Sequence, residues 1–159
     1  MIIKKMEKML LVRYSDFLFS NCIEEHKKII EKNGYCWFGK VGKQKPSKKF
    51  CDIVLKNERP MIFLHSAKKC YICDVENIVF EKPDDNAYPE YYNDILYDKG
   101  NYPSAYFKIR SCYEIEKAVL SNFIVSSSRN LLPSSLHSSM NSIFLVECNN
   151  NIEIRGVDN

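Results

Sequence analysis

The sequence predicts an α/β (α+β) domain in which a twisted, mixed β-sheet of about six strands is flanked by two to three helices. Helical periodicity is confined to a few segments, whereas short apolar or alternating runs of strand length recur along the chain. The 159 residues are 45% hydrophobic and 27% charged, ordinary globular values that fit one domain with one core.

The first helix is predicted between Asn21 and Gly34. Asn21 and Glu24 have the spacing of a capping box, in which the two side chains satisfy free backbone donors at the start of a helix. Ile23 and Ile30 belong to one apolar stripe, and Gly34 is expected to end the helix.

A second helix is predicted after Ser47, which can cap it, and must end before Pro60 because the residue before a proline disfavours helical backbone. Residues 82–102 form a long polar loop rich in tyrosine, and a loop of this length is usually functional or mobile. The serine-rich residues 126–142 are interrupted by leucines, which predicts a tethered loop with one helical turn rather than a linker.

Strands are expected where apolar or alternating runs are bounded by turn residues. They cover residues 10–12, 35–38, 61–64, 70–80, 104–111 and 143–147, and the run 152–155 can pair with the last of them. The strands 61–64 and 70–80 are predicted to form a hairpin near the centre of the sheet, because the short turn at 67–69 joins them.

Charge and cysteine content limit the class of protein. A net charge of +3 is too weak to indicate nucleic-acid binding by itself, although five lysines between Lys40 and Lys49 form either a solvated loop or a surface that faces phosphates. Seven scattered cysteines favour free thiols in a reducing cytoplasm. The sequence shows neither a signal peptide nor an apolar run of about 20 residues, so we expect a cytoplasmic protein without a membrane partner.

No pattern predicts a metal, a cofactor or a catalytic residue. Cys70 and Cys73 lack a second ligand pair for zinc, and on a strand they would point to opposite faces of the sheet. A nuclease-like Pro83-Asp84 is not followed by an acidic residue two positions before a lysine, and no glycine-rich phosphate loop is present. His26 is expected at the surface or edge of the first helix. We therefore expect a binding protein rather than an enzyme.

The order of elements, together with four short phrases, resembles the PUA-like superfamily, especially its YTH and EVE branches. The phrases are Arg13-Tyr14-Ser15-Asp16, Tyr35-Cys36-Trp37-Phe38, Pro60 to Ser66 with the hairpin that follows, and Ser127-Ser128-Arg129-Asn130. The chain departs from the family pattern at Phe38, where a small residue is common, and at Asn130, which replaces an acidic residue. The resemblance implies a PUA-like twisted sheet or open barrel, in a single domain over 1–159 with its core at about 10–148.

This resemblance implies recognition of a flipped, modified nucleobase, with methylation as the expected modification, in DNA or RNA. It makes Trp37 a wall of an aromatic pocket that Tyr91 or Tyr92 closes. Polar groups that read the base would come from Tyr14, Ser15, Asp16, His65 and Ser66, and phosphates would contact Lys40, Lys43, Ser127 and Arg129. Related modules in restriction and defence systems imply a separate effector chain as a further partner.

Two other functions stay open at this stage. A protein-interaction or small-ligand module on the same fold would use the tyrosine-rich residues 88–106. A hydrolase would use His65 with a nearby serine or cysteine, because such partners meet only in the folded chain. A lone tryptophan on an apolar strand is also often part of the core, and this alternative applies to Trp37.

Overall fold

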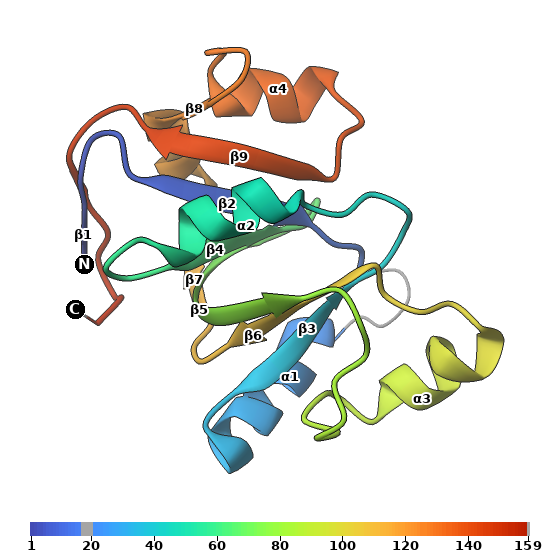
Figure 1. Cartoon of the computed structure of the whole chain (residues 1–159). Coiled ribbons are helices and arrows are strands. Elements are labelled where there is room, and N and C mark those ends of the chain that lie inside the picture. Colours follow the sequence, from blue (N-terminus) through green and yellow to red (C-terminus); the bar gives the residue numbers. More distant parts are fainter. Residues whose placement is uncertain (17–20, 159) are drawn as a thin grey trace.

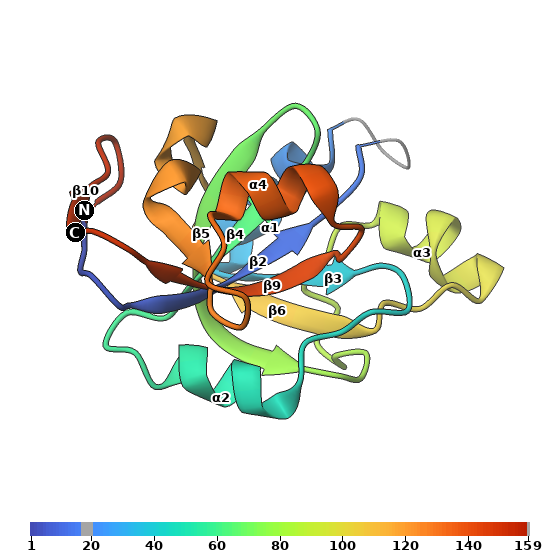
Figure 2. The same cartoon turned by 90° about the horizontal axis from the view of Figure 1, so that it is seen from above.

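A mixed β-sheet runs through the middle of the computed structural model, which describes residues 1–16 and 21–158 (Figures 1 and 2). Within the described residues the sheet has eight strands, in the order β3-β6-β5-β4-β2-β9-β8, with β7 paired to β5. In chain order these are β2 (Lys8–Arg13), β3 (Cys36–Lys40), β4 (Met61–His65), β5 (Cys70–Val79), β6 (Ala105–Ile109), β7 (Tyr113–Ile115), β8 (Phe123–Val125) and β9 (Ile143–Cys148). The sheet stays open, since β3 and β8 are the two ends of this order.

Strand pairing is antiparallel throughout the described sheet except between β2 and β4, which are parallel with Leu10 opposite Ile62. The predicted central hairpin is confirmed, because His65 of β4 pairs with Cys70 of β5. The α+β class and the open twisted sheet are confirmed as well. The sheet has more strands than the six or so expected, because the three-residue strands β7 and β8 also pair with it.

The two faces of the sheet carry separate apolar clusters, as the alternation of side chains along a strand requires. Leu10 and Ile62 belong to one cluster, whereas Leu11 and Phe63 belong to the other. Cys73 lies in the first cluster and Cys70 in the second, so the two sulfurs point to opposite faces as predicted. All seven cysteines are free thiols.

Helices cover both faces. They are α1 (Cys22–Asn33), α2 (Lys48–Leu55), α3 (Tyr91–Ile95) and α4 (Leu132–Ser138), with 3₁₀ turns η1 (Tyr97–Lys99) and η2 (Lys117–Asn122). Helices α1 and α2 pack on the cluster that contains Leu10, and α4 and η2 pack on the other face. Helix α3 lies beyond the edge strand β3, away from both of these layers (Figure 1). None of the helices in the described part of the chain is long and apolar enough to cross a membrane.

Local sequence signals set most helix ends. The Ser47 hydroxyl accepts the Phe50 N–H group at 3.1 Å, which confirms the predicted cap of α2. Gly34 ends α1 with a positive φ of 84°, a conformation that glycine adopts without strain. The predicted capping box is wrong, because Asn21 has φ −100° and ψ 28° and its side chain makes no capping bond. The long loop 82–102 is also more ordered than expected, since it contains α3 and η1.

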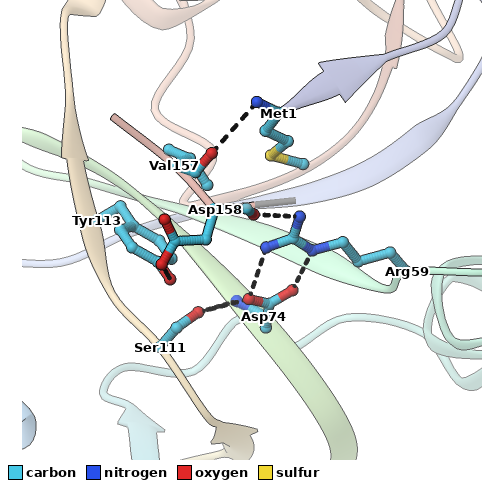
Figure 3. Close-up of polar contacts among 7 residues, drawn as sticks. All are labelled: Met1, Arg59, Asp74, Ser111, Tyr113, Val157 and Asp158. Carbon is cyan, nitrogen blue, oxygen red and sulfur yellow. Dashed lines mark hydrogen bonds and ion pairs between the residues drawn. The ribbon is translucent and has the colours of Figure 1, made fainter. Parts of the chain in front are cut away.

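The two ends of the chain are tied together far from α3 (Figures 1 and 3). The short strands β1 (Ile2–Ile3) and β10 (Ile152–Glu153) pair, and the Met1 amino group donates to the carbonyl oxygens of Ile154 at 3.1 Å and Val157 at 3.2 Å. Beside them, an ion-paired cluster joins the segment before β4, strand β5, the segment after β6 and the C-terminal segment. We call this cluster the terminal clamp; it comprises Arg59, Asp74, Ser111 and Asp158.

In the terminal clamp, the Arg59 guanidinium makes two bonds to Asp74, Nε to Oδ1 at 2.7 Å and Nη2 to Oδ2 at 3.1 Å. Its Nη1 donates to the Asp158 carbonyl oxygen at 2.6 Å, and the Ser111 hydroxyl donates to Asp74 at 2.7 Å (Figure 3). Burial alone would raise the pKa of Asp74, but the hydrogen bonds from Arg59 and Ser111 outweigh it and lower that pKa.

Candidate functional site

A cavity of about 360 Å³ opens between the end of β2, the edge strand β3 and helix α3. We call it the β2–β3 cavity. Its walls include four aromatic rings, those of Tyr14, Phe38, Tyr91 and Tyr92. Its polar groups come from Arg13, Ser15, Lys40 and Ser142. The volume falls within the roughly 300–1,000 Å³ of small-molecule and cofactor pockets, and the mixture of aromatic walls with a few polar groups is typical of them.

Strand geometry places the aromatic walls. Tyr14 follows the last residue of β2, and its N–H donates to the His65 carbonyl oxygen at 2.9 Å. This bond extends the parallel pairing of β2 with β4 by one residue. Its ring meets Phe38 of β3 edge to face, with centroids 6.0 Å apart. Burial raises the pKa of both Tyr14 and Tyr91, so their phenols remain neutral donors and acceptors.

Gly39 allows α3 to approach β3 closely. A Cβ atom at this position would lie 2.6 Å from Pro103 and 3.1 Å from the Tyr92 ring, so any side chain would displace one of them. The Gly39 N–H donates to the Tyr92 hydroxyl at 2.9 Å. The absence of a side chain therefore sets the position of one aromatic wall.

A buried histidine supports the same wall. The His26 ring lies 2.6 Å from the Tyr92 hydroxyl through Nε2 and 2.7 Å from the Cys22 carbonyl oxygen through Nδ1. Since a carbonyl can only accept, Nδ1 carries the proton and Nε2 accepts from Tyr92. Burial lowers the pKa of His26 to about 4. The expectation of a surface histidine is wrong, because His26 of α1 is completely buried, with its ring against Phe38 and Tyr92.

Two cations at the cavity donate to backbone carbonyl oxygens. The Arg13 guanidinium donates to the carbonyl oxygens of Ser139, at 2.9 Å, and Leu136. The Lys40 ammonium donates to the Val41 carbonyl oxygen at 2.5 Å, although this residue is only 4% exposed. Neither side chain takes part in an ion pair within residues 1–16 and 21–158. The cavity therefore combines aromatic walls with two cations that make no ion pair in the described part of the chain.

The predicted wall residue Trp37 does not line the β2–β3 cavity. Trp37 and Phe38 are consecutive residues of β3, so their side chains point to opposite faces, and Phe38 is the one that reaches the cavity. The Trp37 ring is 6% exposed and packs in an aromatic cluster with Tyr92 and Tyr106. Its indole N–H donates to the Asp85 carboxylate at 3.1 Å.

The other residues predicted to read the base separate into three groups. Tyr14, Ser15, Tyr91 and Tyr92 line the β2–β3 cavity. Asp16 instead lines a neighbouring cavity of about 540 Å³, which shares Tyr14 and Ser15 with the first.

His65 and Ser66 line neither of these cavities. The Ser66 hydroxyl accepts the Lys68 and Lys69 N–H groups at 3.3 and 3.1 Å and so stabilises the hairpin turn. Burial, with Lys117 and Arg13 nearby, lowers the pKa of His65 to about 4. Within the described chain no serine or cysteine is hydrogen-bonded to the His65 ring, so the geometry gives the hydrolase alternative no support.

The predicted phosphate ligands are also dispersed. Arg129 forms an ion pair with Glu147 at 2.9 Å. Glu147 pairs with Lys8 at the start of β2, whereas Ile143 pairs with Val12 near the cavity. These two positions of β9 are four residues apart, which corresponds to about 13 Å along the strand. Ser127 is exposed on the same turn as Arg129. Of the four predicted residues, Lys40 lines the cavity and the exposed Lys43 follows its rim.

The tyrosine-rich residues 88–106 fold inwards rather than forming an exposed aromatic patch. Tyr88, Tyr92 and Tyr106 are buried, whereas Tyr102 is 55% exposed. The loop thus supplies a wall of the β2–β3 cavity instead of a separate interaction surface.

Among the lining residues that were not predicted as site residues, three are instructive. Phe38 could have been considered, since side chains alternate along β3 and either Phe38 or Trp37 can face a ligand. Arg13 directly follows the apolar run of β2, which marks it as the first polar residue at the end of a strand. Ser142 has no local signal, because its position depends on the pairing of β9 with β2.

The fold and the cavity together define a class: a small α+β domain with an open mixed sheet and a ligand-sized aromatic cavity at the sheet edge. Comparison with protein families gives the particular family. A family model described as Pua-like matches residues 10–148, most of the chain, and the protein therefore belongs to the PUA-like family. Domains of this family typically bind RNA or DNA. Searches of curated proteins and of solved structures returned no match.

Proposed function

We propose that this protein binds a nucleic acid and holds one flipped, modified base in the β2–β3 cavity. The observation that carries the proposal is the combination in one cavity of the four aromatic rings with Arg13 and Lys40. Flat apolar rings match the faces of a base, and cations without carboxylate partners match the phosphates beside it.

Magnitudes indicate what the cavity would select. Flipping a base out of a stack costs a few kcal/mol, and stacking on aromatic rings returns about 1–3 kcal/mol, so an ordinary base gains little from entering. A methyl group buried among Tyr14, Phe38 and Tyr91 would add roughly 0.8 kcal/mol. That amount corresponds to about a fourfold preference, and a stronger one would require polar contacts from Ser15 or Ser142.

We propose binding rather than catalysis as the role of the cavity. Its thiol, Cys22, has a pKa raised by burial to about 11, and a protonated thiol is a poor nucleophile. Both ring nitrogens of His26 are already engaged in the structure. We propose that any cleavage or signalling, as in a restriction or defence system, is carried out by a separate effector chain.

The test is a paired titration of oligonucleotides that are identical except for one methylated adenine or cytosine, as DNA and as RNA. We expect the wild-type protein to prefer one methylated oligonucleotide. Tyr14→Ala should weaken that binding about tenfold or more, because stacking on one ring is lost. Fluorescence anisotropy measures both.

Tyr113→Ala is the matched control, since Tyr113 is a partly buried tyrosine of β7 that packs against the other sheet face. This variant should bind as the wild type does. Equal affinity of the wild type for the methylated and plain oligonucleotides, or equal effects of the two substitutions, would refute the proposal.

A further inference from the structure

A short loop with a projecting methionine lies at the mouth of the β2–β3 cavity. We call residues 139–142, between α4 and β9, the mouth loop. Figures 1 and 2 show it next to the segment that follows β3. Ser142, at its end, lines the cavity, and Met140, at its tip, is 96% exposed.

The mouth loop is anchored on both sides of Met140. Arg13, which itself lines the cavity, donates from Nη1 to the Ser139 carbonyl oxygen at 2.9 Å, and its backbone N–H donates to the Ser142 carbonyl oxygen at 2.8 Å. The Gln44 side-chain oxygen accepts from the Ser142 N–H at 2.6 Å and from the Ser142 hydroxyl at 2.8 Å. Met140 is thus held in solvent by a loop fixed to the cavity rim.

Met140 differs from the other large apolar side chains at the surface. In the described chain the others are less exposed: Met6 68%, Ile2 63%, Tyr102 55% and Leu131 53%. Met6 and Ile2 lie near the paired termini, away from the cavity. Single exposed apolar residues are common and need no explanation by themselves. What sets Met140 apart is its nearly complete exposure two positions from Ser142, which lines the cavity.

We infer that Met140 is a wedge that occupies the gap left in a duplex when a base moves into the β2–β3 cavity. The inference rests on the proposed function and extends it, because in a duplex the paired neighbours keep the gap open, whereas a flexible single strand can close it by restacking. Proteins that distort duplexes insert apolar side chains, methionine among them, between base steps. Burying the Met140 side chain in the stack would offset part of the energy of unstacking. The expected ligand is therefore double-stranded.

The experiment compares a duplex that carries one methylated base, with 2-aminopurine as its neighbour, to the same methylated strand alone. Met140→Ala should weaken duplex binding about tenfold, since most of the buried apolar side chain is lost. It should also reduce the rise in 2-aminopurine fluorescence that reports unstacking, and leave single-strand binding unchanged. Met140→Leu should retain duplex binding.

Met6→Ala is the control, because it removes an exposed methionine far from the cavity. If Met140→Ala binds the duplex as the wild type does, or if the wild type binds only the single strand, the wedge is refuted. In both cases a loss of binding in Tyr14→Ala would leave the base-binding function standing. If Tyr14→Ala changes binding to neither probe, the proposed function fails and the wedge fails with it.

Discussion

Two arginines in this protein have opposite environments. Arg59, in the terminal clamp, makes a two-point ion pair with Asp74, so its charge is neutralised within the fold. Arg13, at the β2–β3 cavity, donates only to neutral carbonyl oxygens in the hydrogen bonds described above. The comparison shows that an arginine can stabilise the fold through an ion pair at one end of the molecule, and at the other end can leave its positive charge available to a ligand.

The same two regions should differ in their response to acid. Near the cavity, the buried neutral His26 has a pKa of about 4, below the ordinary value of 6.5. The unfolded chain therefore takes up a proton at this site at a higher pH than the folded chain does. The free energy of unfolding falls as the pH drops from about 6.5 to about 4. The pKa of Asp74 is also lowered, so the terminal clamp contributes fully above the ordinary carboxyl pKa and weakens only below it.

The largest effect is expected from His26. Lowering the pH from 7 to 4 should reduce the free energy of unfolding by about 3 kcal/mol through this residue alone, because a pKa unit is worth about 1.4 kcal/mol. His26→Gln should be less stable at pH 7 but lose this part of the acid sensitivity, measured by urea unfolding at several pH values. His137→Gln, an exposed position on α4, should keep the wild-type slope. An unchanged slope in His26→Gln would contradict the assignment.

The second effect concerns the terminal clamp. Arg59→Met should lower the free energy of unfolding by about 2 kcal/mol, because the half-buried Asp74 carboxylate loses its charged partner. Oligonucleotide affinity should not change at temperatures where the variant is folded. A loss of affinity as large as that in Tyr14→Ala would show that the two regions are not independent.

The smallest effect is expected from Arg13. Arg13→Met should weaken oligonucleotide binding about tenfold and reduce the slope of log affinity against log salt by about 1, the signature of one lost phosphate contact. Arg59→Met is the matched control, because it removes an arginine whose charge is already paired. If both variants show the wild-type salt slope, the positive charge at the cavity does not contact phosphate.

Residues that obey local rules were predictable from the sequence. Ser47 and Gly34 mark the ends of helices, and the hairpin of β4 and β5 follows from two apolar runs joined by a short turn. His26 could also have been found, because it follows Ile23 by three positions and precedes Ile30 by four, which places it on the apolar stripe of α1.

The sidedness of β3 could not be predicted. All five of its residues are buried, so the strand lacks the alternation of polar and apolar residues that marks a solvent face. Trp37 and Phe38 were equivalent on sequence grounds, and the position of α3 decides between them. The distance of Arg129 from the cavity could not be predicted either, because it depends on the register of β9 against β2.

The pairing of β9 with β2 has a consequence for how the cavity arises. The cavity joins segments around residues 13, 38, 91 and 142, and its last wall follows from pairing β9 to the first long strand. Such distant contacts make folding slower than in helical bundles of similar size. During synthesis, therefore, most of the chain has left the ribosome before the binding site is complete.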